Sequence, residues 1–192
     1  RIKFLDDIPS PYLSGLLDKF FDGKLTPFIE TNRGCPFRCS FCHTGADYFN
    51  KINQFSEDRI KEEIEYIGKR ASTLGITNLH IADTNYGMYP RDREITSVLL
   101  ESNIKYKWPM SIMATTGKNQ KERVIDITSM LGNIFSVNMS AQSMDAEVLK
   151  NIKRDNISLD DYRDINKHLE SQGRSTKAEL IMLLPGETKE TF

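Results

Sequence analysis

The three cysteines of this 192-residue sequence lie close together, in the stretch RGCPFRCSFCHTG between residues 33 and 45. They are Cys35, Cys39 and Cys42, so their spacing is C-x3-C-x2-C. An odd number of thiols in one loop is a poor disulfide framework, because one thiol is left over. The cluster of thiols indicates a metal site instead, since thiolates are soft ligands that suit zinc and iron–sulfur clusters.

Zinc is one candidate for this site. A structural zinc site has four protein ligands, and a catalytic zinc site has three and an open position. A zinc site here therefore needs His43, His80 or His168 as a further ligand, or an open catalytic position. His43 directly follows Cys42, which is an awkward geometry for two ligands of one ion. The usual zinc pattern also has two separate ligand pairs, whereas this sequence has one group of thiols.

An iron–sulfur cluster explains the spacing better than zinc does. Three thiolates would bind three irons of a four-iron cluster and leave the fourth iron without a protein ligand. An open iron can chelate a substrate or a cofactor. Pro36 stiffens the loop. Phe37 and Phe41 could provide apolar cover, which also tunes the potential of a cluster.

The rest of the sequence predicts the scaffold that must position this loop. Apolar runs predict strands at residues 27–31, 78–83, 109–114, 134–139 and 178–184. Helical patterns lie between and after them, at residues 56–75, 90–102, 120–131, 145–152 and 158–172. Alternating strands and helices indicate an α/β fold with a parallel sheet. Periodicity leaves a doubly wound sheet and part of a barrel as alternatives, and in both the cysteine loop follows a strand at its carboxyl end.

The composition is that of an ordinary globular protein. Hydrophobic residues make up 39% of the sequence, charged residues make up 28%, and the formal net charge is −1. Charges of both signs are interspersed, so no basic stripe marks a nucleic-acid surface. No apolar run approaches the ~18 residues of a membrane-spanning helix, and the N-terminus has no secretory signal. These features favour a cytoplasmic protein without nucleic-acid or membrane partners.

The stretch CPFRCSFC resembles the cluster loop of the radical S-adenosylmethionine (radical SAM) superfamily. In that family three such cysteines hold a [4Fe-4S] cluster, and S-adenosylmethionine chelates the fourth iron through its amino and carboxylate groups. The family has a partial (β/α)6 barrel of the TIM type, so the resemblance favours the barrel, here truncated after strand five. It covers about residues 26–192, and residues 1–25 are expected to form an N-terminal linker or helical segment. The absence of an initial methionine also suggests a fragment or a processed chain.

The resemblance assigns cofactor-binding roles to residues near the first two strands. Phe41, the aromatic residue before the last cysteine, is expected near the adenine of S-adenosylmethionine. Asp83 and Asn85 follow the second strand, where the family binds the methionyl amino group, often with two glycines and a glutamate that this sequence lacks. Both side chains could accept from an ammonium group. The alternative is an Asx-type turn that leads to Gly87.

Further cofactor-binding residues are expected on the last two strands. Ser140 and Gln142 alternate along the fourth strand and could meet the ribose or the methionine carboxylate. Ile181 matches a family isoleucine that packs against adenine, whereas Leu183 stands where the family often has glycine. Glu179 shares a strand face with Ile181, and a carboxylate inside a barrel needs a partner, for which S-adenosylmethionine is a candidate.

Three stretches resemble one branch of the family, the cobalamin-associated radical SAM enzymes: IPSPYLSGLLDKF, SAQSMDAEVLKNIKRDN and ELIMLLPGET. In those enzymes a cobalamin-binding domain precedes the barrel, so cobalamin is expected only in a longer parent protein. The implied function begins when an external electron donor such as flavodoxin or ferredoxin reduces the cluster. S-adenosylmethionine is then cleaved to methionine and a 5′-deoxyadenosyl radical.

The radical would abstract hydrogen from an unidentified small-molecule or peptide substrate, or support cobalamin-dependent methyl transfer. The catalytic residues beyond the cofactor ligands stay unassigned. Two functions from other classes remain as alternatives, a non-catalytic iron–sulfur electron-transfer module and a zinc-stabilised interaction module.

Overall fold

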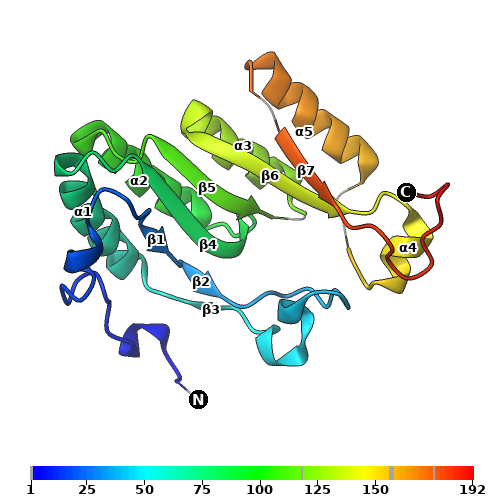
Figure 1. Ribbon diagram of the computed structural model, residues 1–192, viewed down its shortest axis with the longest axis horizontal. Helices are drawn as coiled ribbons and strands as arrows, with labels where there is room; N and C mark the ends of the chain where they lie inside the picture. Colours follow the sequence, from blue (N-terminus) through cyan, green and yellow to red (C-terminus); the bar gives the residue numbers. More distant parts are fainter. Residues whose placement is uncertain (1, 118, 156–157, 175) are drawn as a thin grey trace.

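A parallel β-sheet forms the centre of the protein (Figure 1). The computed structural model describes residues 2–117, 119–155, 158–174 and 176–192. The strands follow the spatial order β1-β4-β5-β6-β7, and all the neighbouring pairs are parallel. They are β1 (Phe28–Ile29), β4 (Asn78–Tyr86), β5 (Ser111–Thr116), β6 (Phe135–Gln142) and β7 (Thr176–Leu180).

The order of the strands in space decides between the two predicted architectures. A doubly wound sheet reverses its strand order at a switch point. Here the spatial order follows the chain from β1 to β7, which is the order that builds a barrel. Within the described residues the sheet is open, with β1 and β7 at its edges. The prediction of a partial barrel with five strands is therefore confirmed.

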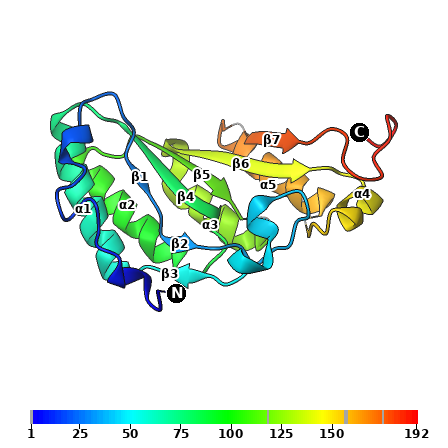
Figure 2. The same cartoon turned by 60° about the horizontal axis from the view of Figure 1, so that its bottom comes forward.

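Helices join the strands and cover one face of the sheet (Figures 1 and 2). They are α1 (Glu57–Thr73), α2 (Asp92–Tyr106), α3 (Lys121–Leu131), α4 (Ala146–Asn151) and α5 (Leu159–Ser171). The short helix α4 lies apart from the others, beyond the carboxyl end of β6. None of the helices in the described ranges is both long and apolar enough to cross a membrane.

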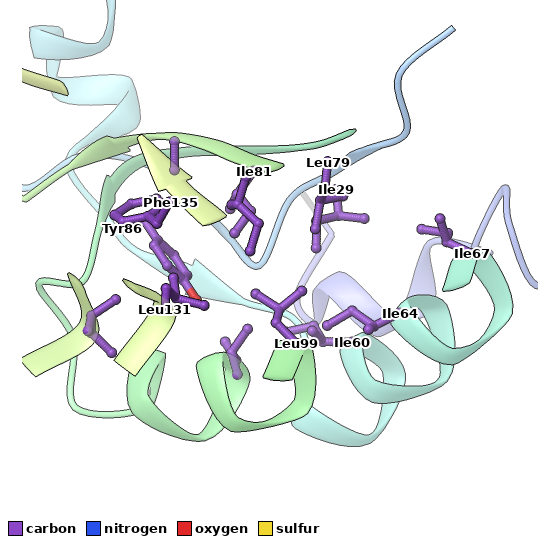
Figure 3. Close-up of a cluster of buried hydrophobic side chains, with 14 of the residues drawn as sticks. Ile29, Ile60, Ile64, Ile67, Leu79, Ile81, Tyr86, Leu99, Leu131 and Phe135 are labelled. Atoms are coloured by element: carbon purple, nitrogen blue, oxygen red, sulfur yellow. The ribbon is translucent and has the colours of Figure 1, made fainter. Parts of the chain in front are cut away.

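Helix α1 shows how the sequence produces this packing. The Ser56 side chain caps its N-terminus by accepting a hydrogen bond from the Arg59 amide at 3.2 Å. Ile60, Ile64 and Ile67 recur at helical spacing and are buried against the sheet, as Figure 3 shows. Each buried isoleucine contributes about 1.5–3 kcal/mol through the apolar surface that it removes from water.

An antiparallel hairpin closes the base of the cysteine loop. It consists of β2 (Asn32–Arg33) paired with β3 (Asn53–Gln54), and sequence reasoning did not predict it. The predicted first strand at residues 27–31 is correspondingly shorter in the structure, because the chain leaves the parallel sheet after Ile29. The hairpin holds the two ends of the cysteine loop side by side below the carboxyl ends of the strands (Figure 2).

The last strand differs from its predicted span of residues 178–184. It begins at Thr176 and ends at Leu180. The Ile181 amide still donates to the Gln142 carbonyl at 2.9 Å, and the chain then turns through Leu183, whose φ is 64°. Leu184 is buried in a second small core, so the apolar run leaves the sheet in order to pack against α4.

The N-terminal segment packs on the body of the protein. It contains two 3-10 turns, Leu5–Asp7 and Asp18–Phe20. Leu5 and Tyr12 belong to the main hydrophobic core, and the Tyr12 hydroxyl donates to the Phe28 carbonyl at 2.9 Å. The division into residues 1–25 and 26–192 stays a prediction.

Candidate metal centre and cofactor site

The three thiols line one cavity of about 190 Å³. Cys35 and Cys39 are buried, whereas Cys42 is exposed. The lining also includes polar side chains at or near the carboxyl ends of three parallel strands, namely Thr84, Thr115, Ser140 and Gln142. This is the edge at which parallel α/β folds gather their functional groups.

The path of the cysteine loop depends on backbone contacts and on glycine. The Cys35 amide donates to the Phe49 carbonyl at 2.9 Å, and the Cys42 amide donates to the Cys39 carbonyl at 3.1 Å. A Cβ atom at Gly45 would lie 2.2 Å from the Cys39 carbonyl oxygen. That separation is far below a van der Waals contact, so only glycine allows the loop to close so tightly.

The donor set fits a four-iron cluster. Each thiolate of such a cluster binds a different iron, so the sulfurs must surround a shared volume, as the three thiols do here. Within the described ranges, no group of three or more histidine, cysteine, aspartate or glutamate side chains is placed to hold one metal ion.

The three histidines that a zinc site would need have other contacts. His43 packs against the Phe49 ring at 5.0 Å between centroids, and His80 packs against Phe28 at 5.0 Å. His168 Nε2 lies 3.0 Å from the Ser129 hydroxyl. The described lining of the thiol cavity contains none of these rings.

Polar groups from the chain contact each thiol. Asn85, which is fully buried on β4, donates from Nδ2 to Cys35 Sγ at 3.5 Å. The hydroxyl of Thr44 lies 3.1 Å from Cys42 Sγ. Arg154 donates from Nη1 to Cys39 Sγ at 3.9 Å. Thr44 belongs to the cysteine loop, whereas Asn85 and Arg154 are distant in sequence and are brought to the loop by the fold.

Arg154 is a buried cation beside the thiols. Its side chain also donates to the Ser140 carbonyl, and its guanidinium carbon lies 6.0 Å from the centroid of the Phe41 ring. Burial lowers the pKa of Arg154, and the three nearby cysteines act in the opposite direction. Sequence reasoning missed this residue. It lies in the charged run KNIKRDN after a short helix, where no pattern separates it from solvent-exposed charges.

Three of the predicted cofactor residues lie around the cavity with the cysteines: Phe41, Ser140 and Gln142. The cavity lining does not include Asn85, which lies behind Cys35 and contacts its sulfur.

Asp83 is a further predicted residue that the structure keeps out of the cavity. It is buried, and its carboxylate accepts hydrogen bonds from the Thr31 amide at 2.7 Å, the Thr31 hydroxyl, and Asn32 Nδ2 at 2.6 Å. Burial raises the pKa of Asp83 to about 6, and the hydrogen bonds from Thr31 act against that rise. In this position Asp83 joins β4 to the residues that lead into the cysteine loop.

The two predicted residues around strand β7 also lie outside the cavity lining. Glu179 accepts hydrogen bonds from the Ser140 hydroxyl at 2.7 Å and from Asn138 Nδ2 at 3.1 Å. The hydrogen bond from Ser140 lowers the pKa of Glu179 the most, and the hydrogen bond from Asn138 lowers it further. Ile181 packs in the small core beside α4. Ser140 thus connects Glu179 to the cavity wall.

Solved structures share this fold. The radical S-adenosylmethionine methyltransferase TsrM from Kitasatospora setae, with cobalamin and a [4Fe-4S] cluster bound, superposes with a TM-score of 0.70 at 17% identity over 86% of this chain and 32% of that chain. The cobalamin-dependent S-adenosylmethionine radical enzyme OxsB, with aqua-cobalamin bound, superposes with a TM-score of 0.67 at 18% identity over 95% and 27%.

Curated relatives match the whole chain. The cobalamin-dependent radical SAM methyltransferase TokK of Streptomyces tokunonensis is 34% identical over an alignment of 201 positions that covers 100% of this chain and 29% of that protein. The 2-(S-pantetheinyl)-carbapenam-3-carboxylate methyltransferase of Streptantibioticus cattleyicolor is 32% identical over 97% of this chain and 28% of that protein. The chain therefore spans less than a third of the length of these relatives.

The family model of the radical SAM superfamily matches residues 29–192, which include the cysteine loop and the whole parallel sheet except Phe28. This match agrees with the arrangement of the three thiols around one cavity at the carboxyl edge of the sheet. The chain belongs to the radical SAM superfamily of enzymes.

Proposed function

We propose that this chain is the core of a radical SAM enzyme that cleaves S-adenosylmethionine reductively. Cys35, Cys39 and Cys42 would hold a [4Fe-4S] cluster, and S-adenosylmethionine would bind the remaining iron. The observation that carries this proposal is the single cavity that all three thiols share with the polar ends of the parallel strands.

The residues of the chain would bind, orient and shield these cofactors. Cys35 and Cys39 are buried, so two sides of the cluster would be kept from water. Arg154 would offset the negative charge of the thiolates from a buried position. When bound, the reduced cluster supplies one electron that breaks the sulfonium bond of S-adenosylmethionine, which gives methionine and a 5′-deoxyadenosyl radical.

The cavity wall suits the adenosyl part of the ligand. Phe41 offers an aromatic ring, and Ser140 and Gln142 offer polar groups in the same cavity. Phe41 is 37% exposed, so its ring is available to stack on a flat base. We propose that these residues orient the nucleoside, which stays consistent with the roles expected from the sequence.

Methyl transfer is the reaction that we propose for the parent protein. Two relatives that match nearly the whole chain are named methyltransferases, and one is named as cobalamin-dependent. We propose cobalamin as a further cofactor on this basis. A flavodoxin or a ferredoxin is the proposed electron donor.

The test is anaerobic reconstitution with iron and sulfide. We expect about four irons per chain, and an electron paramagnetic resonance signal of the reduced protein that changes when S-adenosylmethionine is added. Cys39→Ala should lose the cluster, whereas Ser40→Ala, at an exposed position of the same loop, should keep it. Methionine and 5′-deoxyadenosine should then form when a reductant is present.

Two results would contradict the proposal. Stoichiometric zinc with no visible absorbance, in protein purified without oxygen, would support the zinc-stabilised module. A four-iron cluster whose signal stays the same at saturating S-adenosylmethionine would support the electron-transfer module.

A further inference from the structure

Each of the three thiols has its own polar neighbour, and these neighbours differ in burial. Asn85 Nδ2 lies 3.5 Å from Cys35 Sγ, and the Asn85 side chain is fully buried. Arg154 Nη1 lies 3.9 Å from Cys39 Sγ, and Arg154 is 7% exposed. The third pair, Thr44 and Cys42, is close to the surface. The two buried cysteines are therefore the ones with buried nitrogen donors.

The direction of the Asn85 contact follows from chemistry. An amide nitrogen can only donate, so the sulfur of Cys35 is the acceptor. The Asn85 side chain also donates to the Thr84 hydroxyl at 3.0 Å, which holds the amide in its orientation. Hydrogen bonds to a ligand sulfur stabilise the more negative, reduced state of a cluster more than the oxidised state. Burial strengthens this effect, because no water competes for the sulfur.

Arg154 acts on the same equilibrium through its charge. A guanidinium stays protonated at all ordinary pH values, so it places a permanent positive charge beside Cys39. Its second contact, with the Ser140 carbonyl, keeps the group at the cavity wall. When the cluster gains an electron, this charge stabilises the product of reduction.

We propose that Asn85 and Arg154 raise the reduction potential of the cluster, and so decide which donors can reduce it. The proposal rests on the proposed function, since it requires a cluster on these thiols. Asn85 and Arg154 are positioning residues in this role, because they act through the sulfurs of Cys35 and Cys39. The exposed Thr44 contact is expected to have a smaller effect, because water can replace it.

The experiment is a reductive titration of the reconstituted protein, followed by electron paramagnetic resonance and visible absorbance. Asn85→Leu removes the donor at similar volume, and Arg154→Met removes the charge at similar length. Both potentials should shift to more negative values, at iron contents equal to that of the unaltered protein. Ser40→Ala is the matched control in the same loop and should leave the potential unchanged. Thr44→Val should shift it less than Asn85→Leu does.

If Asn85→Leu or Arg154→Met loses the cluster, more conservative variants at the same two positions test the proposal. Asn85→Asp keeps the shape but replaces the donor with an acceptor, so its potential should also fall. Arg154→Lys keeps the positive charge and should retain more of the potential than Arg154→Met does. Unchanged potentials in Asn85→Asp and in Arg154→Met, at full iron content, would overturn this inference and leave the proposed function standing. Failure of the unaltered protein to assemble a cluster would overturn both.

Discussion

Asp83 is a carboxylate that the fold buries, and its replacement by asparagine tests the free energy of that burial. The pKa of Asp83 is raised to about 6 in the folded state, from an ordinary value of 3.8. The folded protein therefore binds a proton at Asp83 more tightly than the unfolded chain does. Stability from this group is present at low pH and is lost as the pH rises through about 6.

The magnitude follows from the two pKa values. Between pH 7 and pH 5 the folded state takes up most of one proton at Asp83, whereas the unfolded state takes up almost none. Integrating the difference gives about 1 kcal/mol of extra unfolding free energy at pH 5 relative to pH 7. The variant Asp83→Asn has no proton to bind, so it should lack this increment.

The assay is urea unfolding of the metal-free protein and of Asp83→Asn at pH 5 and pH 7. The measured quantity is the difference in unfolding free energy between the two proteins, because titrating groups that Asp83 does not influence then cancel. Burial raises the pKa of Asp92 to about 6, and the charge of Asp83 raises it as well, so in Asp83→Asn the pKa of Asp92 should fall and change the difference in the same direction. We expect the difference to move by about 1 kcal/mol in favour of the unaltered protein at pH 5. An equal difference at both pH values would refute the reasoning, and so would a change of the opposite sign.

Three further predictions concern packing and the loop. Gly45→Ala should reduce the iron bound on reconstitution, because its Cβ would lie 2.2 Å from the Cys39 carbonyl; an unchanged iron content would contradict the close approach. Ile64→Ala should lower the unfolding free energy by about 2–5 kcal/mol, whereas Ile104→Ala on the exposed side of α2 should change it by less than about 0.5 kcal/mol. Ser56→Ala should cost about 1 kcal/mol through the lost cap of α1, and thermal unfolding that matches the unaltered protein would exclude this role.

Much of the scaffold could be predicted from the sequence, because its signals are local. In α1, for example, the spacing of the isoleucines and the capping residue Ser56 can both be recognised from the sequence of that one helix. The apolar run from Leu180 to Leu184 predicted a longer strand, because a run of apolar residues occurs both in buried strands and in turns that pack against a core. In the structure Leu184 packs against residues of α4, which is distant in sequence, and the chain forms a turn there instead of a longer strand. The hairpin at Asn32 was missed because its strands have two residues each.

The cysteines could be identified as candidate metal ligands because three thiols at fixed spacing are a local signal, and the structure places all three around one cavity. The residues around them could not all be placed. Asp83 and Asn85 alternate with Thr84 on one strand, so sequence reasoning gave both the same role. The structure directs Asp83 to Thr31 and Asn85 to Cys35, a difference that depends on how the loop crosses the strand. Arg154 had no local signal, because only the tertiary fold brings it to Cys39.

The small core of Val148, Ile152 and Leu184 links the cysteine loop to the turn that follows β7. The Ser40 amide donates to the Ile152 carbonyl at 2.9 Å, and Asn151 Nδ2 donates to the Pro185 carbonyl at 3.1 Å. From these contacts we expect the loop, α4 and the turn to unfold locally as one cooperative unit. Metal bound at the thiols should therefore slow the hydrogen exchange of the Leu184 and Glu187 amides, although both residues are distant in sequence from the three cysteines.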